Sequence, residues 1–199
     1  MRDTRRMTCR PQSRWITVTA AWIALALAVW SGAATAEPLR FRVQPEASEV
    51  GFRATSRFMN ANGTFGRFKG DVVVDPKDPT TAKVRVIVEA ASIDTGIEMR
   101  DNHLRSEDFL DVNRFPTVTF ESERVEMAGR RATVMGRLTV HGVTREIAVA
   151  VDVQMSEMAL VATGEFVLRR SEYGINYSSL LNPVGNDVRV TFTFRARAS

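Results

Sequence analysis

The fold is decided by the stretch Thr133-Val-Met-Gly-Arg-Leu-Thr-Val-His-Gly-Val-Thr-Arg-Glu-Ile-Ala-Val-Ala-Val-Asp-Val153. From Val134 to Val140, and again from Ile147 to Val153, every second residue is apolar or glycine, and polar or small residues stand between most of them. Side chains of a β-strand point to alternate faces, so this period predicts strands with one apolar and one wet face, as in antiparallel sheets. The turn sequence His141-Gly-Val143 lies between the two runs and predicts a hairpin.

Similar runs of period two extend over most of the chain. The clearest alternate from Lys83 to Val88 and from Val188 to Arg195. Shorter or less regular runs cover Leu39–Val43, Glu49–Ala54, Thr64–Val74, Thr117–Val125 and Leu160–Leu168. No long crossover helix separates these runs, so the strands follow one another as an antiparallel meander. Because closure removes exposed sheet edges, we predict an all-β fold, a single antiparallel β-barrel of about eight strands.

One segment interrupts the β pattern. Thr95-Gly-Ile-Glu98 has the form of a capping box, and Ser106-Glu-Asp108 resembles a second helix start. Pro116 ends the interruption before the next strand run. We therefore predict a short helical insertion over residues 96–112, near one mouth of the barrel. It either covers that mouth as a lid or plugs the barrel end with its apolar side chains.

The N-terminal segment has the features of a targeting sequence. Met1–Arg14 carries five arginines and one acidic residue, and a mainly apolar run follows from Trp15 to Trp30. Ala34-Thr-Ala36 then has the small-x-small form of a cleavage site. The apolar run is short for a membrane-spanning helix, which needs about 20 residues. We predict that residues 1–36 are a secretory signal peptide, rather than an uncleaved anchor, and that residues 37–199 are one exported domain.

The charge of the whole chain is dominated by this leader. The sequence has 27 basic and 23 acidic residues, and removing five and one of them leaves 22 of each. The exported domain is therefore formally neutral, which argues against nucleic acid as a partner. The one cysteine, Cys9, lies in the predicted signal peptide, so the domain has no disulfide and no cysteine ligand for a metal.

Residues suited to catalysis are few. The chain has two histidines, His103 and His141, and the sequence contains no nucleophile elbow, zinc-protease motif or phosphate loop. Neither histidine has partners at metal-ligand spacing. We predict no catalytic residue, no metal, no cofactor and a protein that is not an enzyme.

Apolar side chains are abundant, with eleven phenylalanines in the sequence. Phenylalanine is common in packed cores, and ligand cavities are also mostly apolar. A barrel of this size is either filled by side chains or holds one small ligand, and the alternation leaves both open. The positions that we predict to line the interior are Phe52, Phe65, Val86, Phe109, Phe120, Val134, Leu138, Val149, Phe166 and Phe192.

Several ordered segments resemble the YceI-like family. They are Gly63-Thr-Phe-Gly-Arg-Phe-Lys-Gly-Asp-Val-Val-Val-Asp75, Val88–Ser122, Gly136–Arg145, Arg170-Ser-Glu-Tyr-Gly-Ile175 and Val184-Gly-Asn-Asp-Val188. The resemblance covers nearly all of residues 39–195. It implies a lipocalin-like barrel, usually periplasmic and often a homodimer, that binds a polyisoprenoid or similar long-chain amphiphile. It therefore favours a hollow barrel over a filled one.

This chain departs from the family pattern at positions expected near a ligand's polar head. Family members often have histidine just before and within the first long strand, where this chain has Ala47 and Ser56. Candidate head-group contacts are Arg100, His103 and Arg105 in the insertion. We expect a periplasmic binding or carrier protein that holds the lipid in its barrel. The alternatives are an enzyme acting on a bound lipid and a stress-related structural protein with a filled barrel.

Overall fold

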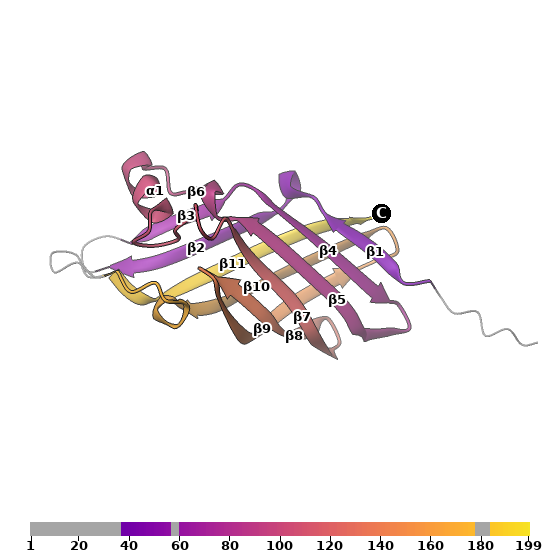
Figure 1. Cartoon of the computed structure of the whole chain (residues 1–199). Helices are drawn as coiled ribbons and strands as arrows, with labels where there is room; N and C mark the ends of the chain where they lie inside the picture. The colour runs from indigo at the N-terminus through magenta and orange to yellow at the C-terminus, as the bar shows by residue number, and fades with distance from the viewer. Residues whose placement is uncertain (1–36, 57–59, 178–183) are drawn as a thin grey trace, which may run out of the picture. The chain divides into compact units, whose positions relative to one another are not determined.

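The computed structural model describes residues 37–56, 60–177 and 184–199 (Figure 1), and the predicted signal peptide lies outside them. The described residues contain one α-helix, α1 (Glu98–Arg105), and three 3₁₀ helices, η1 (Pro45–Ala47), η2 (Ala90–Ser92) and η3 (Arg170–Tyr173). The strands are β1 (Leu39–Val43), β2 (Glu49–Ser56), β3 (Ala61–Phe65), β4 (Phe68–Asp75), β5 (Asp78–Glu89), β6 (Ile93–Asp94), β7 (Thr117–Ala128), β8 (Arg131–Val140), β9 (Val143–Met155), β10 (Ala159–Arg169) and β11 (Val184–Ala198).

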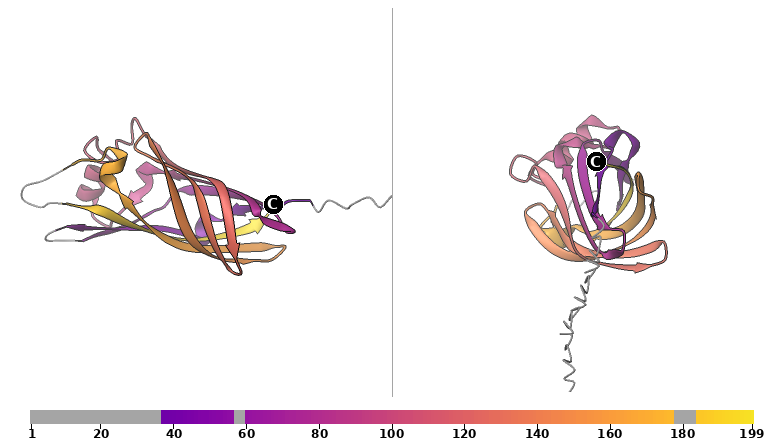
Figure 2. Two further views of the ribbon diagram at one scale, coloured as in Figure 1. Left: turned by 90° about the horizontal axis from the view of Figure 1, so that it is seen from below. Right: turned by 90° about the vertical axis from the view of Figure 1, so that its right-hand side faces the viewer.

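Eight strands close into an antiparallel barrel. Their order is β1-β4-β5-β7-β8-β9-β10-β11, and β11 pairs back to β1. The end-on view in Figure 2 shows the strands curving around a common interior. The predicted all-β, single antiparallel barrel with one short helix is therefore confirmed.

The described residues form eleven strands, although the barrel has eight, because three wall strands are each divided into two. β11 pairs with β2 from Val184 to Thr193 and with β1 from Ala196 to Ala198, so β1 and β2 together act as one wall strand broken at η1. η1 begins with Pro45, which lacks the N–H that a continuous ladder needs. β5 and β6 are likewise separated by η2.

The prediction of one continuous strand over Thr64–Val74 is wrong, because the chain turns a corner at Gly66 and Arg67, between β3 and β4. The Gly66 N–H donates to the Ser92 carbonyl at 3.1 Å, and the Glu89 N–H donates to the Arg67 carbonyl at 2.9 Å. At this corner, hydrogen bonds to η2 and to the end of β5 replace those of a regular strand pair. The Gly66 N–H and the Arg67 carbonyl therefore keep hydrogen-bond partners.

The two ends of the barrel differ. We call the end that carries α1, η3 and the β8–β9 turn the helix end (Figure 1). The other end, with the turns β4–β5, β7–β8 and β9–β10, is the hairpin end. The predicted turn between β8 and β9 is a two-residue loop in which His141 and Gly142 have φ values of 50° and 75°. Positive φ at both positions is the geometry of a type I′ hairpin.

Two apolar clusters pack at these two ends. The cluster toward the hairpin end includes Phe41, Leu160 and Ala196, whose exposed fractions are 1%, 5% and 2%. The cluster at the helix end consists of Leu138, Val140, Tyr173 and Ile175. Along β8 the even-numbered residues from Ala132 to Val140 are buried, as the alternation predicts. Full burial of such a side chain stabilises the fold by roughly 1.5–3 kcal/mol.

The insertion is less helical than predicted. Only α1 is an α-helix, and the predicted second start at Ser106 is wrong, because Ser106 is extended and ends α1 by donating its hydroxyl to the His103 carbonyl at 2.8 Å. Turns then lead to Asp111, where a φ of 43° reverses the chain. Ile97 is the N-cap and forms no side-chain cap, so the predicted capping box is absent. Within the described residues, no helix is long and apolar enough to cross a bilayer.

Gly136 on β8 is required by close packing against β7. A Cβ there would lie 2.8 Å from the Ser122 Cα and still closer to the Glu121 carbonyl oxygen, beside an irregularity in the β7–β8 register. We expect Gly136→Ala to lower the free energy of unfolding by about 1–3 kcal/mol, because backbone must shift to make room. Urea unfolding followed by circular dichroism measures this. Gly66→Ala is the control, since its Cβ would meet only the Ser92 carbonyl at 3.9 Å. Equal midpoints for the two variants would contradict the packing argument.

Candidate ligand-binding cavity

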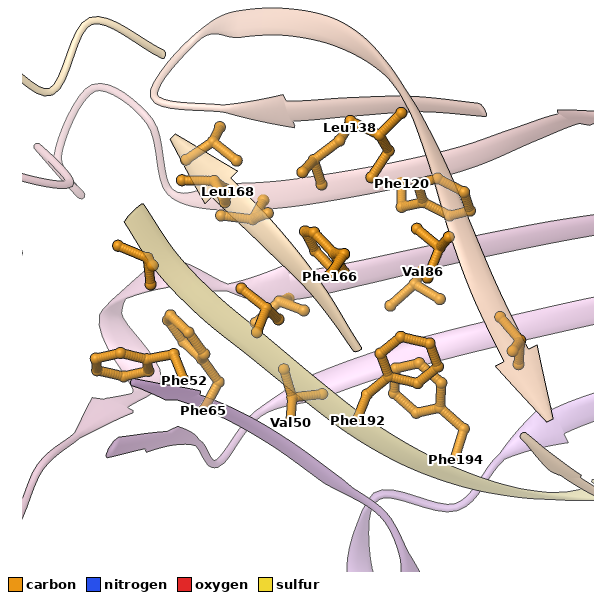
Figure 3. A pocket seen from close by; sticks show the side chains of 18 of the residues that line it. Val50, Phe52, Phe65, Val86, Phe120, Leu138, Phe166, Leu168, Phe192 and Phe194 are labelled. Atoms are coloured by element: carbon orange, nitrogen blue, oxygen red, sulfur yellow. The ribbon is translucent and has the colours of Figure 1, made fainter. Parts of the chain in front are cut away.

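The barrel encloses a cavity of about 830 Å³. Ligand pockets for small molecules usually have volumes of about 300–1,000 Å³, so this one is large enough for a substantial guest. Its wall draws residues from strands on every side of the barrel, because the inward side chains of each strand alternate with outward ones. Figure 3 shows labelled side chains of this wall, among them Phe120, Phe166 and Phe192, gathered in the interior.

All ten residues that the sequence predicts as lining lie on the cavity wall. They are Phe52, Phe65, Val86, Phe109, Phe120, Val134, Leu138, Val149, Phe166 and Phe192. Their contact with a ligand stays a prediction. Phe194, which is not among the predicted positions, also lies on the wall. It continues the inward face of β11 two residues after Phe192 and follows from the same alternation.

Several inward phenylalanines are only half-buried. Phe166, Phe192 and Phe194 point to the interior but retain accessible surface, in contrast to Phe41. Phe192 and Phe194 stack on each other with ring centroids 5.0 Å apart, and Phe52 lies 5.7 Å from Phe65. The rings therefore line the wall in pairs and leave the space in front of them open. The described residues form a hollow barrel, not a filled one.

The cavity is polar at one end and apolar along the rest. At the helix end its wall includes Thr55, Ser56, Arg100, His103, Arg170 and Tyr177. At the hairpin end the wall includes Pro79, Met127 and Met155. Asp71 and Arg85 also belong to the wall residues, but their side chains form ion pairs with Arg42 and Glu121. An elongated molecule with one polar end matches this distribution.

α1 brings Arg100 and His103 to the cavity. The buried Asp101 carboxylate accepts hydrogen bonds from the Thr95 N–H, at 2.9 Å, and from the Thr95 hydroxyl, which fastens α1 to the preceding strand. Arg100 donates from Nε to the Thr95 hydroxyl at 2.8 Å and from Nη2 to the Thr95 carbonyl at 2.9 Å. Thr95 therefore orients Arg100 instead of capping the helix.

His103 is part of an aromatic group at the helix end. Its ring stands edge-on to Phe109 and Tyr177, with centroid distances of 5.0 Å and 4.9 Å. Its Nε2 lies 3.1 Å from an Asp108 carboxylate oxygen. These contacts join α1 to the chain that follows η3.

The other predicted head-group contact, Arg105, is placed differently. Its Nε and Nη2 donate to the carbonyls of Ala91 and Ile93, at 2.9 Å and 2.6 Å, and it does not contribute to the cavity wall. Of the two positions where the family often has histidine, Ser56 lies on the wall, and Ala47 is an exposed residue of η1 outside it.

Arg170 is a wall residue that the sequence analysis missed. Its guanidinium donates to three main-chain carbonyls, from Nε to Gly185 at 3.0 Å, from Nη1 to Ile175 at 2.7 Å and from Nη2 to Val184 at 2.9 Å. Burial lowers the pKa of this guanidinium from its ordinary value. The sequence around it, Arg169-Arg-Ser-Glu-Tyr173, does not reveal which arginine turns inward, because η3 breaks the alternation there.

η3 is fixed in place by its last residues. Tyr173 is 2% exposed in the helix-end cluster, and burial raises the pKa of its hydroxyl, with the Glu172 carboxylate acting in the same direction and Arg145 against it. Gly174 ends η3 in the left-handed conformation with a φ of 76°. The Tyr173 carbonyl lies 3.2 Å from the His141 Nδ1, so His141 holds η3 to the β8–β9 turn.

In residues 37–56, 60–177 and 184–199, no group of three or more histidine, cysteine, aspartate or glutamate side chains is arranged to hold a metal ion. His103 lies on the cavity wall, and its partner Asp108, with the carboxylate 3.1 Å from Nε2, does not belong to that wall.

The closed antiparallel barrel and its apolar cavity define a lipocalin-like class of small-ligand barrel. The model of the YceI-like domain matches residues 41–196, and the chain belongs to this family.

Curated relatives match over part of the chain. A UPF0312 protein of Pseudomonas aeruginosa is 44% identical over 87 residues, which cover 44% of this chain and 46% of the relative. A UPF0312 protein of Yersinia enterocolitica is 42% identical over 85 residues, covering 43% of this chain and 44% of the relative. The matched part thus spans less than half the length of these relatives.

Solved structures share the fold. BcnA of Burkholderia cenocepacia has a TM-score of 0.71 at 23% identity, and the match covers 77% of this chain and 98% of BcnA. A polyisoprenoid binding domain from Saccharophagus degradans has a TM-score of 0.66 at 17% identity, covering 81% and 99% of the two chains. The YceI protein of Campylobacter jejuni has a TM-score of 0.63 at 20% identity, covering 72% and 88%.

The attachment of α1 through Asp101 can be measured. We expect Asp101→Ala to lower the free energy of unfolding by about 1–3 kcal/mol, because it leaves the Thr95 N–H and hydroxyl without their buried acceptor. Asp108→Ala is the control, since that carboxylate is half exposed and should contribute less than about 1 kcal/mol. Urea unfolding of both variants gives the comparison, and an Asp101→Ala variant no less stable than Asp108→Ala would refute this role.

Proposed function

We propose that the protein is a periplasmic binding or carrier protein that holds a polyisoprenoid or similar long-chain amphiphile inside its barrel. The observation that carries this proposal is the cavity, which is apolar over most of its length and whose polar side chains gather mainly at the helix end. A hydrocarbon chain fits the apolar part, and a polar head fits the helix end.

The energetics favour such a ligand. Each methylene that leaves water contributes about 0.8 kcal/mol, so a chain of a few isoprene units gains enough free energy to bind without a charged anchor. A short polar metabolite would gain little from the wall, because phenylalanine and valine side chains offer it no hydrogen bonds. The wall therefore selects for long apolar guests.

The comparisons support the same class of ligand. The chain belongs to the YceI-like family, and one structural neighbour is a polyisoprenoid binding domain. We propose binding without catalysis, and the periplasmic location rests on the predicted signal peptide of residues 1–36. The homodimer that the resemblance implies stays a prediction, which light scattering of the exported domain would check.

A first experiment looks for the natural guest. The exported domain is purified from its own host, denatured in organic solvent and analysed by mass spectrometry. We expect about one long-chain lipid per barrel, because one cavity of this kind holds one small ligand. Preparations that are repeatedly empty, and that also reject added prenyl lipids, would argue against the proposal.

A second experiment fills the cavity. Ala162 lies on the cavity wall in β10, and its neighbour Thr163 lies on the outer face of the same strand. We expect Ala162→Trp to weaken binding of a prenyl alcohol at least tenfold, because the indole occupies the space of the guest. Thr163→Trp is the matched control and should bind as the unmodified domain does. Calorimetric titration measures the affinities.

Tryptophan fluorescence of the same two variants shows whether each new side chain lies inside or outside the barrel. The sequence has three tryptophans, Trp15, Trp22 and Trp30, all before residue 37, so each variant of the exported domain carries a single tryptophan. We expect blue-shifted emission from position 162 and red-shifted emission from position 163. A folded, blue-shifted Ala162→Trp variant that binds with unchanged affinity would count against a guest in this cavity.

A further inference from the structure

Arg170 differs from the arginines of the outer wall in its partners. The outer arginines lie beside carboxylates, as Arg189 does with Glu165 at 2.8 Å and Arg137 with Glu123 at 3.1 Å. Even the adjacent Arg169 faces Glu172 at 3.4 Å. Arg170 has no ion pair with any described residue, and its hydrogen-bond partners among these residues are all neutral carbonyl oxygens. Its positive charge is therefore not balanced by a neighbouring acid in the described part of the chain.

The guanidinium also retains hydrogen-bonding capacity. An arginine side chain has five N–H donors, and the described residues accept three of them, one from Nε and one from each terminal nitrogen. Within the described residues, one N–H on Nη1 and one on Nη2 remain without an acceptor. Because the bonds to Ile175, Val184 and Gly185 fix the plane of the group, these two donors have a fixed direction.

The position of Arg170 relates these donors to the ligand cavity. Arg170 belongs to the cavity wall, and so do Thr55 and Ser56 at the end of β2. Ser56 pairs with Val184 across β2 and β11, and the Val184 carbonyl is itself an acceptor for Arg170. Two hydroxyl-bearing residues therefore lie next to the segment that holds the guanidinium.

An unbalanced cation on an apolar cavity is costly in the empty protein. Burial disfavours the charged form of a group, and for Arg170 it lowers the pKa accordingly. Arginine nevertheless stays charged at neutral pH. An anion that enters the cavity would offset this cost, and phosphate oxygens suit the planar fork of a guanidinium, which can bind them through two N–H groups.

We propose that Arg170 is the recognition site for an anionic, phosphate-bearing head group, so that the barrel selects prenyl phosphates over prenyl alcohols. This inference rests on the proposed function, because the apolar tail must occupy the cavity for the head to reach Arg170. Thr55 adds a hydroxyl beside the phosphate. Arg100, on the same wall, adds positive charge at the helix end.

The competing explanation is a purely structural one, in which Arg170 only ties η3 to the start of β11. The two explanations differ in a measurable way. A structural tie affects every ligand alike, whereas a head-group site affects phosphates and leaves alcohols nearly unchanged. The preference for one head group over the other is therefore the quantity to measure.

The test titrates the exported domain with geranylgeranyl phosphate and with geranylgeraniol, which have the same tail. We expect the unmodified domain to bind the phosphate at least tenfold more tightly than the alcohol. Arg170→Gln should lose that preference while its affinity for the alcohol changes less than threefold. Arg170→Lys, which keeps the charge but not the fork, should retain part of the preference. Arg169→Gln, on the outer wall, should retain all of it.

The outcomes separate the possible failures. Equal affinity of the unmodified domain for phosphate and alcohol overturns the inference even if Arg170→Gln does not fold, and it leaves the proposed function intact. An equal loss of both ligands in a folded Arg170→Gln variant also overturns it, in favour of the structural tie. Binding of neither ligand by the unmodified domain overturns the proposed function itself.

One more titration distinguishes recognition of a lipid phosphate from binding of free inorganic phosphate. Inorganic phosphate alone should show no saturable binding at millimolar concentration, because it gains nothing from the apolar wall. Saturable binding of inorganic phosphate as tight as that of geranylgeranyl phosphate would overturn the assignment to a lipid head group.

Discussion

The structure depends on the pairing of β11 with strands on both of its sides. One edge of β11 follows β10 from Asp187 to Arg197, and the other edge meets β2 and then β1. This last strand therefore joins the two ends of the meander and removes the open edges that a sheet would otherwise expose. Because the barrel is closed by main-chain hydrogen bonds, its interior does not need to be filled for the walls to hold together. A cavity lined by pairs of phenylalanine rings is compatible with such a wall.

The closed wall also explains the polarity of the interior. Strand alternation supplies apolar side chains along the shaft, from the valines of β8 and β9 to the rings of β11. Polar groups enter only where the alternation ends, at the end of β2, in α1 and in η3. Carbonyls of η2 and β6 bind the guanidinium of Arg105, and the carbonyls of Ile175, after η3, and Val184, at the start of β11, bind that of Arg170. The same breaks in the β pattern thus create both the helix end and its positive charge.

The sequence predicted the regular part of this arrangement and missed the irregular part. The barrel and nine of the ten wall residues follow from period two, because successive side chains of a strand point to opposite faces of the sheet. The tenth, Phe109, lies in the turns of the insertion. The interruption at η1 was predicted, because Leu39–Val43 and Glu49–Ala54 were given as separate runs. The break at Gly66 was not predicted, since a residue distant in sequence, Ser92, accepts its hydrogen bond. Thr95 was predicted as a helix cap, but the buried Asp101 carboxylate competes for its hydroxyl. Arg170 was missed because only the fold of η3 distinguishes it from Arg169.

The short β6 has a consequence for kinetics. It pairs with β3 through two residues, Asp94 and Ile93, whereas β10 and β11 pair along eleven positions from Ala159 to Arg169. Segments joined by few main-chain bonds unfold locally at a lower free-energy cost than the remainder of a protein. The β3–β6 corner therefore opens at a lower free-energy cost than the β10–β11 ladder. Its local opening can change without a change in the melting temperature of the barrel.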